Sequence, residues 1–291
     1  MSFAQPTYAE RFFESRDGLK LYYRDYAGPQ DKLPVLCLHG LTRDSRDFDF
    51  LAQRLAPKRR LIVPDQRGRG RSQHDRCWYN YQPAVYIEDM WTLLRELQLA
   101  RVVVIGTSLG GLMGIAMASL RRACIAGLIL NDVGPEIDPT GLERIRSYVG
   151  RLPEVHSWEE AAQQLRGMFG GAFPDFDDQR WMQFARQTFA EDANGMPKPS
   201  SDPAIGDAMR SIPIPPGATQ AMWFGFASLR GMPVLALRGE KSDLLSVATF
   251  ERMQRELPGL IRVTVPERGH PPQLDEPPCI QAIESFLSSC E

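Results

Sequence analysis

Short, continuous apolar runs separated by helix-length segments constrain the fold of this chain more than any other feature. The first four runs, which contain no charged residue, are 35–38, 61–63, 102–105 and 125–130. Such runs predict strands that are buried on both faces, as in a parallel sheet covered by helices. Candidate helices lie at 48–55, 83–97 and 109–120. Because strand and helix alternate, the pattern predicts an α/β protein with a mostly parallel central sheet flanked by helices.

The alternation stops after residue 130 and returns late in the chain. Two further apolar runs and a closing helix are expected at 234–237, 261–265 and 278–287, and an exposed early strand at 19–26. The segment between shows apolar residues at helical spacing, interrupted by Pro-rich stretches. We therefore predict a core of residues 1–134 and 227–291 and a helical cap, or lid, of residues 135–226.

Large aromatic side chains in this insertion allow two interpretations. Trp158, Trp181, Trp223 and Phe226 either wall an apolar pocket beneath a lid or only pack the insertion onto the core. The sequence leaves both open for each residue.

The pentapeptide Gly106-Thr107-Ser108-Leu109-Gly110 links a predicted strand directly to a predicted helix. A sharp turn there would strain the backbone of Ser108, and the flanking glycines remove side chains that would collide across it. The hydroxyl would then stand at the N-terminus of a helix, whose free N–H groups favour negative charge. A nucleophile elbow requires this context, so Ser108 is predicted to be a catalytic nucleophile.

A serine hydroxyl is a weak nucleophile until a base takes its proton. Among the four histidines, His270 follows the last predicted strand, where a loop can bring it over the edge of the sheet. We predict that His270 is the base and that Asp243, after the strand 234–237, is the acid that orients it. This gives the chain order Ser, Asp, His. Asp132, which follows the strand 125–130, is the alternative acid.

An acyl-transfer site also needs hydrogen-bond donors for an oxyanion. The backbone N–H of Leu109, next to the nucleophile, is one candidate. The second is the N–H of Leu41, in the segment His39-Gly40-Leu41 that follows the strand 35–38. His39 either braces this loop or touches the substrate.

Composition and charge exclude several classes of function. The chain has 34 Lys and Arg against 36 Asp and Glu, so its net charge of −2 disfavours nucleic-acid and anionic-membrane partners. No apolar stretch of about 18 residues occurs, so a membrane span is not expected. The five cysteines lie far apart and form no Cys-x-x-Cys pair, which favours free thiols in the cytoplasm and no metal site. The sequence does not set the oligomeric state.

Several motifs together resemble the α/β-hydrolase superfamily. They are Leu38-His39-Gly40-Leu41, the Asp-x-Arg-Gly-x-Gly-x-Ser segment at 65–72, the elbow, the Arg-Gly-Glu-x-Ser-Asp segment at 238–243, and Gly269-His270. The resemblance implies that Arg67 and Ser72 belong to a structural loop. The dehalogenase and epoxide-hydrolase branches of this superfamily carry an aspartate at the elbow, and Ser108 argues against both.

These features predict a serine hydrolase that acts on a small or medium organic molecule. Ser108, His270 and Asp243 would cleave an ester, a lactone or a C–C bond beside a carbonyl through an acyl-enzyme or related oxyanion intermediate. No metal or organic cofactor is implied. The alternatives are a cofactor-free haloperoxidase-like perhydrolase and, on fold alone, a ligand receptor.

Overall fold

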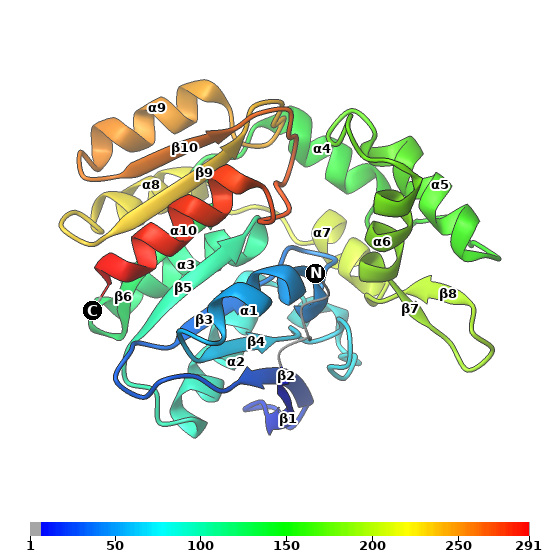
Figure 1. Ribbon diagram of the computed structural model, residues 1–291, viewed down its shortest axis with the longest axis horizontal. Coiled ribbons are helices and arrows are strands. Elements are labelled where there is room, and N and C mark those ends of the chain that lie inside the picture. Colours follow the sequence, from blue (N-terminus) through cyan, green and yellow to red (C-terminus); the bar gives the residue numbers. More distant parts are fainter. Residues whose placement is uncertain (1–6, 291) are drawn as a thin grey trace.

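A mostly parallel sheet of eight strands forms the centre of the protein, shown by a computed structural model that describes residues 7–290 (Figure 1). Its strands are β1 (Ala9–Glu14), β2 (Lys20–Tyr26), β3 (Val35–Leu38), β4 (Leu61–Pro64), β5 (Val102–Thr107), β6 (Ile125–Asn131), β9 (Val234–Gly239) and β10 (Ile261–Val265). Their order across the sheet is β1-β2-β4-β3-β5-β6-β9-β10. Strand β2 runs antiparallel to both of its neighbours, β1 and β4, and the other neighbouring pairs are parallel. The predicted α/β fold is confirmed.

Helices cover both faces of this sheet. One face carries α1 (Asp49–Leu55) and α10 (Pro277–Ser289), and the other carries α2 (Pro83–Glu96), α3 (Leu109–Leu120), α8 (Ala218–Ala227) and α9 (Val247–Glu256). Strand β5 shows why both faces are apolar. Val102 and Val104 belong to the cluster under α2 and α3, whereas Val103 and Ile105 belong to the cluster under α1 and α10. The continuous run is therefore a strand whose alternate side chains enter two cores.

Strand β2 is largely buried, whereas the sequence predicts an exposed strand over 19–26. It pairs with β4 on one side and with β1 on the other, where Ala9 lies opposite Asp25 and Glu14 opposite Lys20. Leu21 and Tyr22 are buried as a result. The charged sequence of β1 gave no signal of this edge strand, so the protection of β2 was not foreseen.

Four helices and a short hairpin between β6 and β9 stand at the carboxyl end of the sheet, and we call this segment the cap (Figure 1). It contains α4 (Pro139–Tyr148), α5 (Trp158–Phe169), α6 (Asp178–Thr188), the hairpin of β7 (Phe189–Glu191) and β8 (Pro197–Pro199), and α7 (Ala204–Ser211). Helices α5 and α6 enclose a separate apolar cluster that includes Phe173, Trp181 and Phe184. The sequence predicts that this region is helical, and β8 lies in a stretch where it predicts a Pro-rich interruption, whereas β7 was not predicted.

Helix α8 packs differently from the rest of the predicted cap. Its Trp223 and Phe226 belong to the main core cluster, and a Cβ added to Gly225 would lie 3.2 Å from Ser119 Oγ on α3. The predicted cap, residues 135–226, thus includes α8, although this helix lies against the core. Periodicity in the sequence shows that α8 is helical but not which layer it covers.

Among residues 7–290, no helix combines the length and apolar character that crossing a membrane requires. The five cysteines are free, and Cys37, Cys279 and Cys290 are buried.

The loop at 65–72 is held by a buried guanidinium. Arg67 donates to Asp89 from Nε and Nη2 at 2.7 Å, to Asp75 at 2.6 Å and to Asp17 at 2.8 Å. Ser72 Oγ accepts from the Tyr22 amide at 2.8 Å, which ties the loop to β2. These contacts match the structural role that the resemblance implies for Arg67 and Ser72.

We predict that Arg67→Met lowers the free energy of unfolding by about 3–5 kcal/mol, because Asp89 and Asp75 remain buried without their cation. Urea unfolding measures the loss. Arg71→Met is the control, since the exposed pair of Arg71 with Glu10 contributes less than about 1 kcal/mol. Equal losses in both variants would contradict the buried network.

Candidate active site

Ser108 lies in a sharp turn between β5 and α3. Its φ of 51° and ψ of −115° are a strained backbone conformation for a serine. Two glycines make the turn possible. A Cβ on Gly110 would lie 2.1 Å from the carbonyl oxygen of Leu38, and one on Gly106 would lie 2.4 Å from the backbone of Gly110. A larger residue at either position would collide with the backbone, so the elbow that the sequence predicts requires both glycines.

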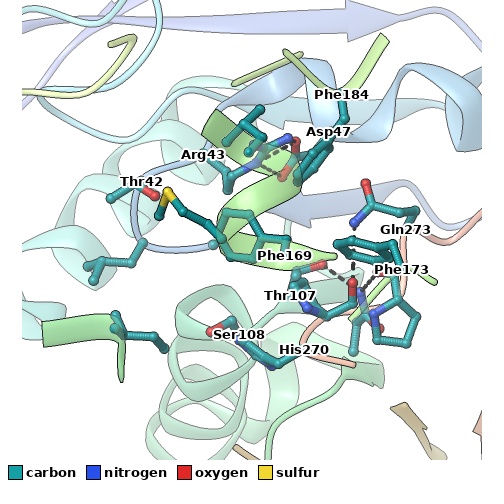
Figure 2. A pocket seen from close by; sticks show the side chains of 18 of the residues that line it. Thr42, Arg43, Asp47, Thr107, Ser108, Phe169, Phe173, Phe184, His270 and Gln273 are labelled. Carbon is teal, nitrogen blue, oxygen red and sulfur yellow. Dashed lines mark hydrogen bonds and ion pairs between the residues drawn. The ribbon is translucent and has the colours of Figure 1, made fainter. Parts of the chain in front are cut away.

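His270 follows β10 on the loop to α10 and lies beside the serine (Figure 2). Its Nε2 is 3.0 Å from Ser108 Oγ, and its Nδ1 is 2.8 Å from Asp132 Oδ2. A carboxylate only accepts hydrogen bonds, so Nδ1 carries the proton and Nε2 is the acceptor that faces the serine hydroxyl. The structure therefore brings Ser108 and His270 together as predicted.

Asp132 is the carboxylate on His270, in a fully buried position. Its φ of 55° turns the chain sharply at the end of β6. Oδ1 accepts from the Gly239 amide at 2.8 Å, and Oδ2 also accepts from Ser242 Oγ at 2.6 Å. With these donors and the imidazole, the buried carboxylate is fixed in one orientation.

The prediction that Asp243 orients His270 is wrong. The Asp243 carboxylate faces the cap and pairs with Arg144 of α4, with 2.8 Å between Oδ1 and Nη2. Burial raises the pKa of Asp243, but the hydrogen bonds and charge of Arg144 outweigh it and hold this pKa below its ordinary value. The carboxylate is therefore ionised and committed to α4, and the alternative acid Asp132 occupies the position on the imidazole.

The Leu41 and Leu109 amides are the predicted donors for an oxyanion. Leu109 is the first residue of α3, and Leu41 lines the pocket that holds Ser108. Within residues 7–290, neither amide donates to a protein acceptor. Arg69 Nε holds the Leu41 loop by donating to the Leu41 carbonyl at 2.9 Å. Both predicted donors are thus free to bind an oxyanion.

His39 is buried below the same loop. Its Nε2 accepts from the Gln66 amide at 3.0 Å, and Nδ1 lies 2.8 Å from the Gly40 carbonyl. Burial lowers the pKa of His39 to about 4, so the imidazole is neutral at pH 7. The sequence left two roles open for His39, and these hydrogen bonds support the one in which it braces the loop.

The pocket above Ser108 encloses about 100 Å³ and is mostly apolar (Figure 2). The cap contributes Ile145 and Tyr148 of α4, Leu165, Met168 and Phe169 of α5, and Phe184 of α6. None of Trp158, Trp181, Trp223 and Phe226 is among the lining residues, all of which belong to the described part of the chain. Those four aromatics pack the cap or the core, and other cap residues wall the pocket.

A charged pair, Arg43 and Asp47, lines the end of this pocket beside Phe184 (Figure 2). Arg43 Nε lies 2.9 Å from Asp47 Oδ1 and 3.0 Å from Oδ2. Burial raises the pKa of Asp47 above its ordinary value, although the Arg43 cation opposes this. This pair was not identified from the sequence. The one sequence feature that could have indicated it is an Arg and an Asp four residues apart, directly after the Leu41 loop.

The cap is also bonded to the loop that carries His270. Arg268 pairs with Asp175 at 2.7 Å, and the Gly269 amide donates to the Ala172 carbonyl at 2.8 Å. Arg180 of α6 pairs with Asp275 on the other side of the histidine. These contacts hold the loop on both sides of His270 from the cap, while Asp132 and Ser108 bond the imidazole itself.

No group of three or more His, Cys, Asp or Glu side chains within residues 7–290 is arranged to hold a metal ion.

Comparison with known proteins places this chain among hydrolases. The model of the alpha/beta hydrolase family matches residues 35–279. A crystal structure of an alpha/beta hydrolase from Novosphingobium aromaticivorans has a TM-score of 0.91 and 40% identity over 99% of each chain. A 3-hydroxybutyrate-oligomer hydrolase of Cupriavidus necator is 32% identical over 274 residues, 92% of this chain and 93% of the relative. A 2-(acetamidomethylene)succinate hydrolase of Mesorhizobium japonicum is 25% identical over 81% of each chain.

This chain belongs to the alpha/beta hydrolase family. The family and the names of the relatives support hydrolase activity.

We predict that Asp132→Asn lowers kcat by about 10,000-fold, because an amide favours the wrong imidazole tautomer and removes the charge that stabilises the imidazolium. Asp243→Asn changes kcat less than about tenfold, since its partner is Arg144. Hydrolysis of 4-nitrophenyl acetate measures both, with circular dichroism to verify folding. The assignment fails if Asp243→Asn is the more damaging change.

Proposed function

We propose that the protein is a serine hydrolase that cleaves carboxylic esters. The observation that carries this proposal is the unbroken line of hydrogen bonds from Ser108 Oγ through His270 to the buried Asp132. A side chain that only packs needs no such line. A pocket that only binds a ligand needs no strained serine, so the same observation favours an enzyme over a ligand receptor.

Each step of the reaction has a residue in place. Ser108 Oγ attacks the ester carbonyl while its proton passes to His270 Nε2, and Asp132 stabilises the imidazolium. The amides of Leu41 and Leu109 hold the oxyanion of the tetrahedral intermediate. The alcohol leaves with the proton from His270, and the acyl group remains on Ser108. Water then loses a proton to His270, attacks the acyl-enzyme and releases the acid.

The proposed substrates are short aliphatic esters of hydroxycarboxylic acids. The relative from Cupriavidus necator is named for the hydrolysis of 3-hydroxybutyrate oligomers and aligns with nearly the whole of this chain. The apolar walls given by α4, α5 and α6 suit short aliphatic units rather than a highly charged molecule. The cap helices α4 to α6 thus supply apolar walls for the substrate, and the core supplies the chemistry.

A fluorophosphonate probe tests the nucleophile. We expect peptide mapping to find the label on Ser108, and Ser108→Ala to lose both the label and at least about 1000-fold in the rate of ester hydrolysis. Ser147→Ala, on the exposed side of α4, is the matched control and keeps both. Ester hydrolysis that survives Ser108→Ala, or a folded wild-type protein without label on Ser108, would overturn the proposal.

A further inference from the structure

Arg43 stands close to the proposed nucleophile. It follows Leu41 by two residues, and the same loop holds both. A Cβ on Gly40 would lie 3.4 Å from Arg43 Cγ and 3.8 Å from Ser108 Cβ. The Arg43 stem and the Ser108 side chain are therefore no farther apart than the sum of these two distances. A short ester bound at Ser108 lies within reach of the guanidinium.

Three contacts fix the guanidinium in one orientation. Asp47 accepts from Nε and Nη2, which uses one edge of the group. Thr188 of α6 accepts from Nη1, and the Phe184 ring lies 4.8 Å from Arg43 Cζ on one face. A group held in this way loses little freedom when it binds a further acceptor.

The guanidinium still has donors to offer. Of its five N–H groups, those bonds use one on each nitrogen and leave one on Nη1 and one on Nη2 without a partner among residues 7–290. Neither faces the Asp47 oxygens, which occupy the edge formed by Nε and Nη2. Among the described residues that line the pocket, Arg43 carries the one permanent positive charge. The free N–H groups of a fixed guanidinium can donate charge-assisted hydrogen bonds to a carboxylate.

We propose that Arg43 is a specificity-determining residue that binds a free carboxylate on the ester substrate, so that the preferred substrates are monoanionic short esters. This inference rests on the proposed ester hydrolysis and adds the charge of its substrate. Asp47 positions the guanidinium, and the apolar cap residues take up the rest of the ester.

The test compares two pairs of esters that differ only at the carboxylate. One pair is the linear dimer of 3-hydroxybutanoate and its terminal primary amide, with the charge on the alcohol part. The other is monoethyl glutarate and its terminal amide, with the charge on the acyl part. In at least one pair, we expect the wild type to cleave the acid with the higher kcat/KM, measured by chromatography of the products.

The double variant Arg43→Gln/Asp47→Asn removes the cation without leaving Asp47 as a buried unpaired charge. We expect it to lower kcat/KM for the preferred acid by about 10- to 100-fold, the loss typical of a hydrogen bond to a charged group, and to change kcat/KM for the amide less than about threefold. Arg43→Lys keeps the charge and should recover part of the loss. The amide is the internal control for folding and for the catalytic residues.

The double variant Arg46→Gln/Asp44→Asn is the matched control for the connection between cap and core, because Arg46 pairs with the buried carboxylate of Asp44. Arg46 also bonds the cap, donating to the carbonyls of Arg186 at 2.7 Å and Phe189 at 2.6 Å, but it does not line the pocket. A structural role of Arg43 would make both variants slow acid and amide equally. That result, or a wild type that cleaves amide and acid equally well in both pairs, overturns the role of Arg43. Failure of Ser108 labelling would instead overturn ester hydrolysis itself.

Discussion

The parallel pairing of β5 with β6 is the constraint on which the candidate site depends. Thr107 lies opposite Asn131, so Ser108 and Asp132 are the next residues on two neighbouring strands. Both have a positive φ, and both turn away from the sheet at the same edge. The Ser108 amide donates to the Asn131 carbonyl, and the Asp132 amide to the Leu237 carbonyl of β9. The proposed nucleophile and the proposed acid are thus positioned by the sheet, whereas His270 lies on a loop.

Hydrogen bonds and ion pairs between the cap and the core hold the loops beside this sheet edge. The cap is bonded to the Leu41 loop through Arg43 and Arg46 and to the His270 loop through Arg180 and Arg268. The two loops that complete the site are therefore both held from above. These ion pairs and hydrogen bonds keep the cap over the pocket, and Arg43 with its partner Asp47 is the charged pair on the pocket wall.

Much of the core was predictable because buried strands require apolar residues, which can be recognised in the sequence. A strand covered on both faces must be apolar at every position, which made β3, β4, β5, β6 and β9 recognisable. The elbow was predictable because its sharp turn leaves no room for side chains at two positions, and the sequence has glycine at both. Strand β1 was not, since an edge strand needs no apolar run. The packing of α8 on α3 and the contact of Arg43 with Thr188 of α6 join segments far apart in the chain, and such contacts leave no local pattern.

The sequence by itself determined the α/β alternation, the strained Ser108, the late His270 and the amides of Leu41 and Leu109. It left two acids at the carboxyl edge, and chain order favoured the wrong one. Asp132 follows directly on β6, so its position is set by the strand, whereas Asp243 lies four residues beyond the end of β9 and faces Arg144. Only the tertiary structure decided between them, because a hydrogen bond to an imidazole depends on direction and distance in space, and chain order specifies neither.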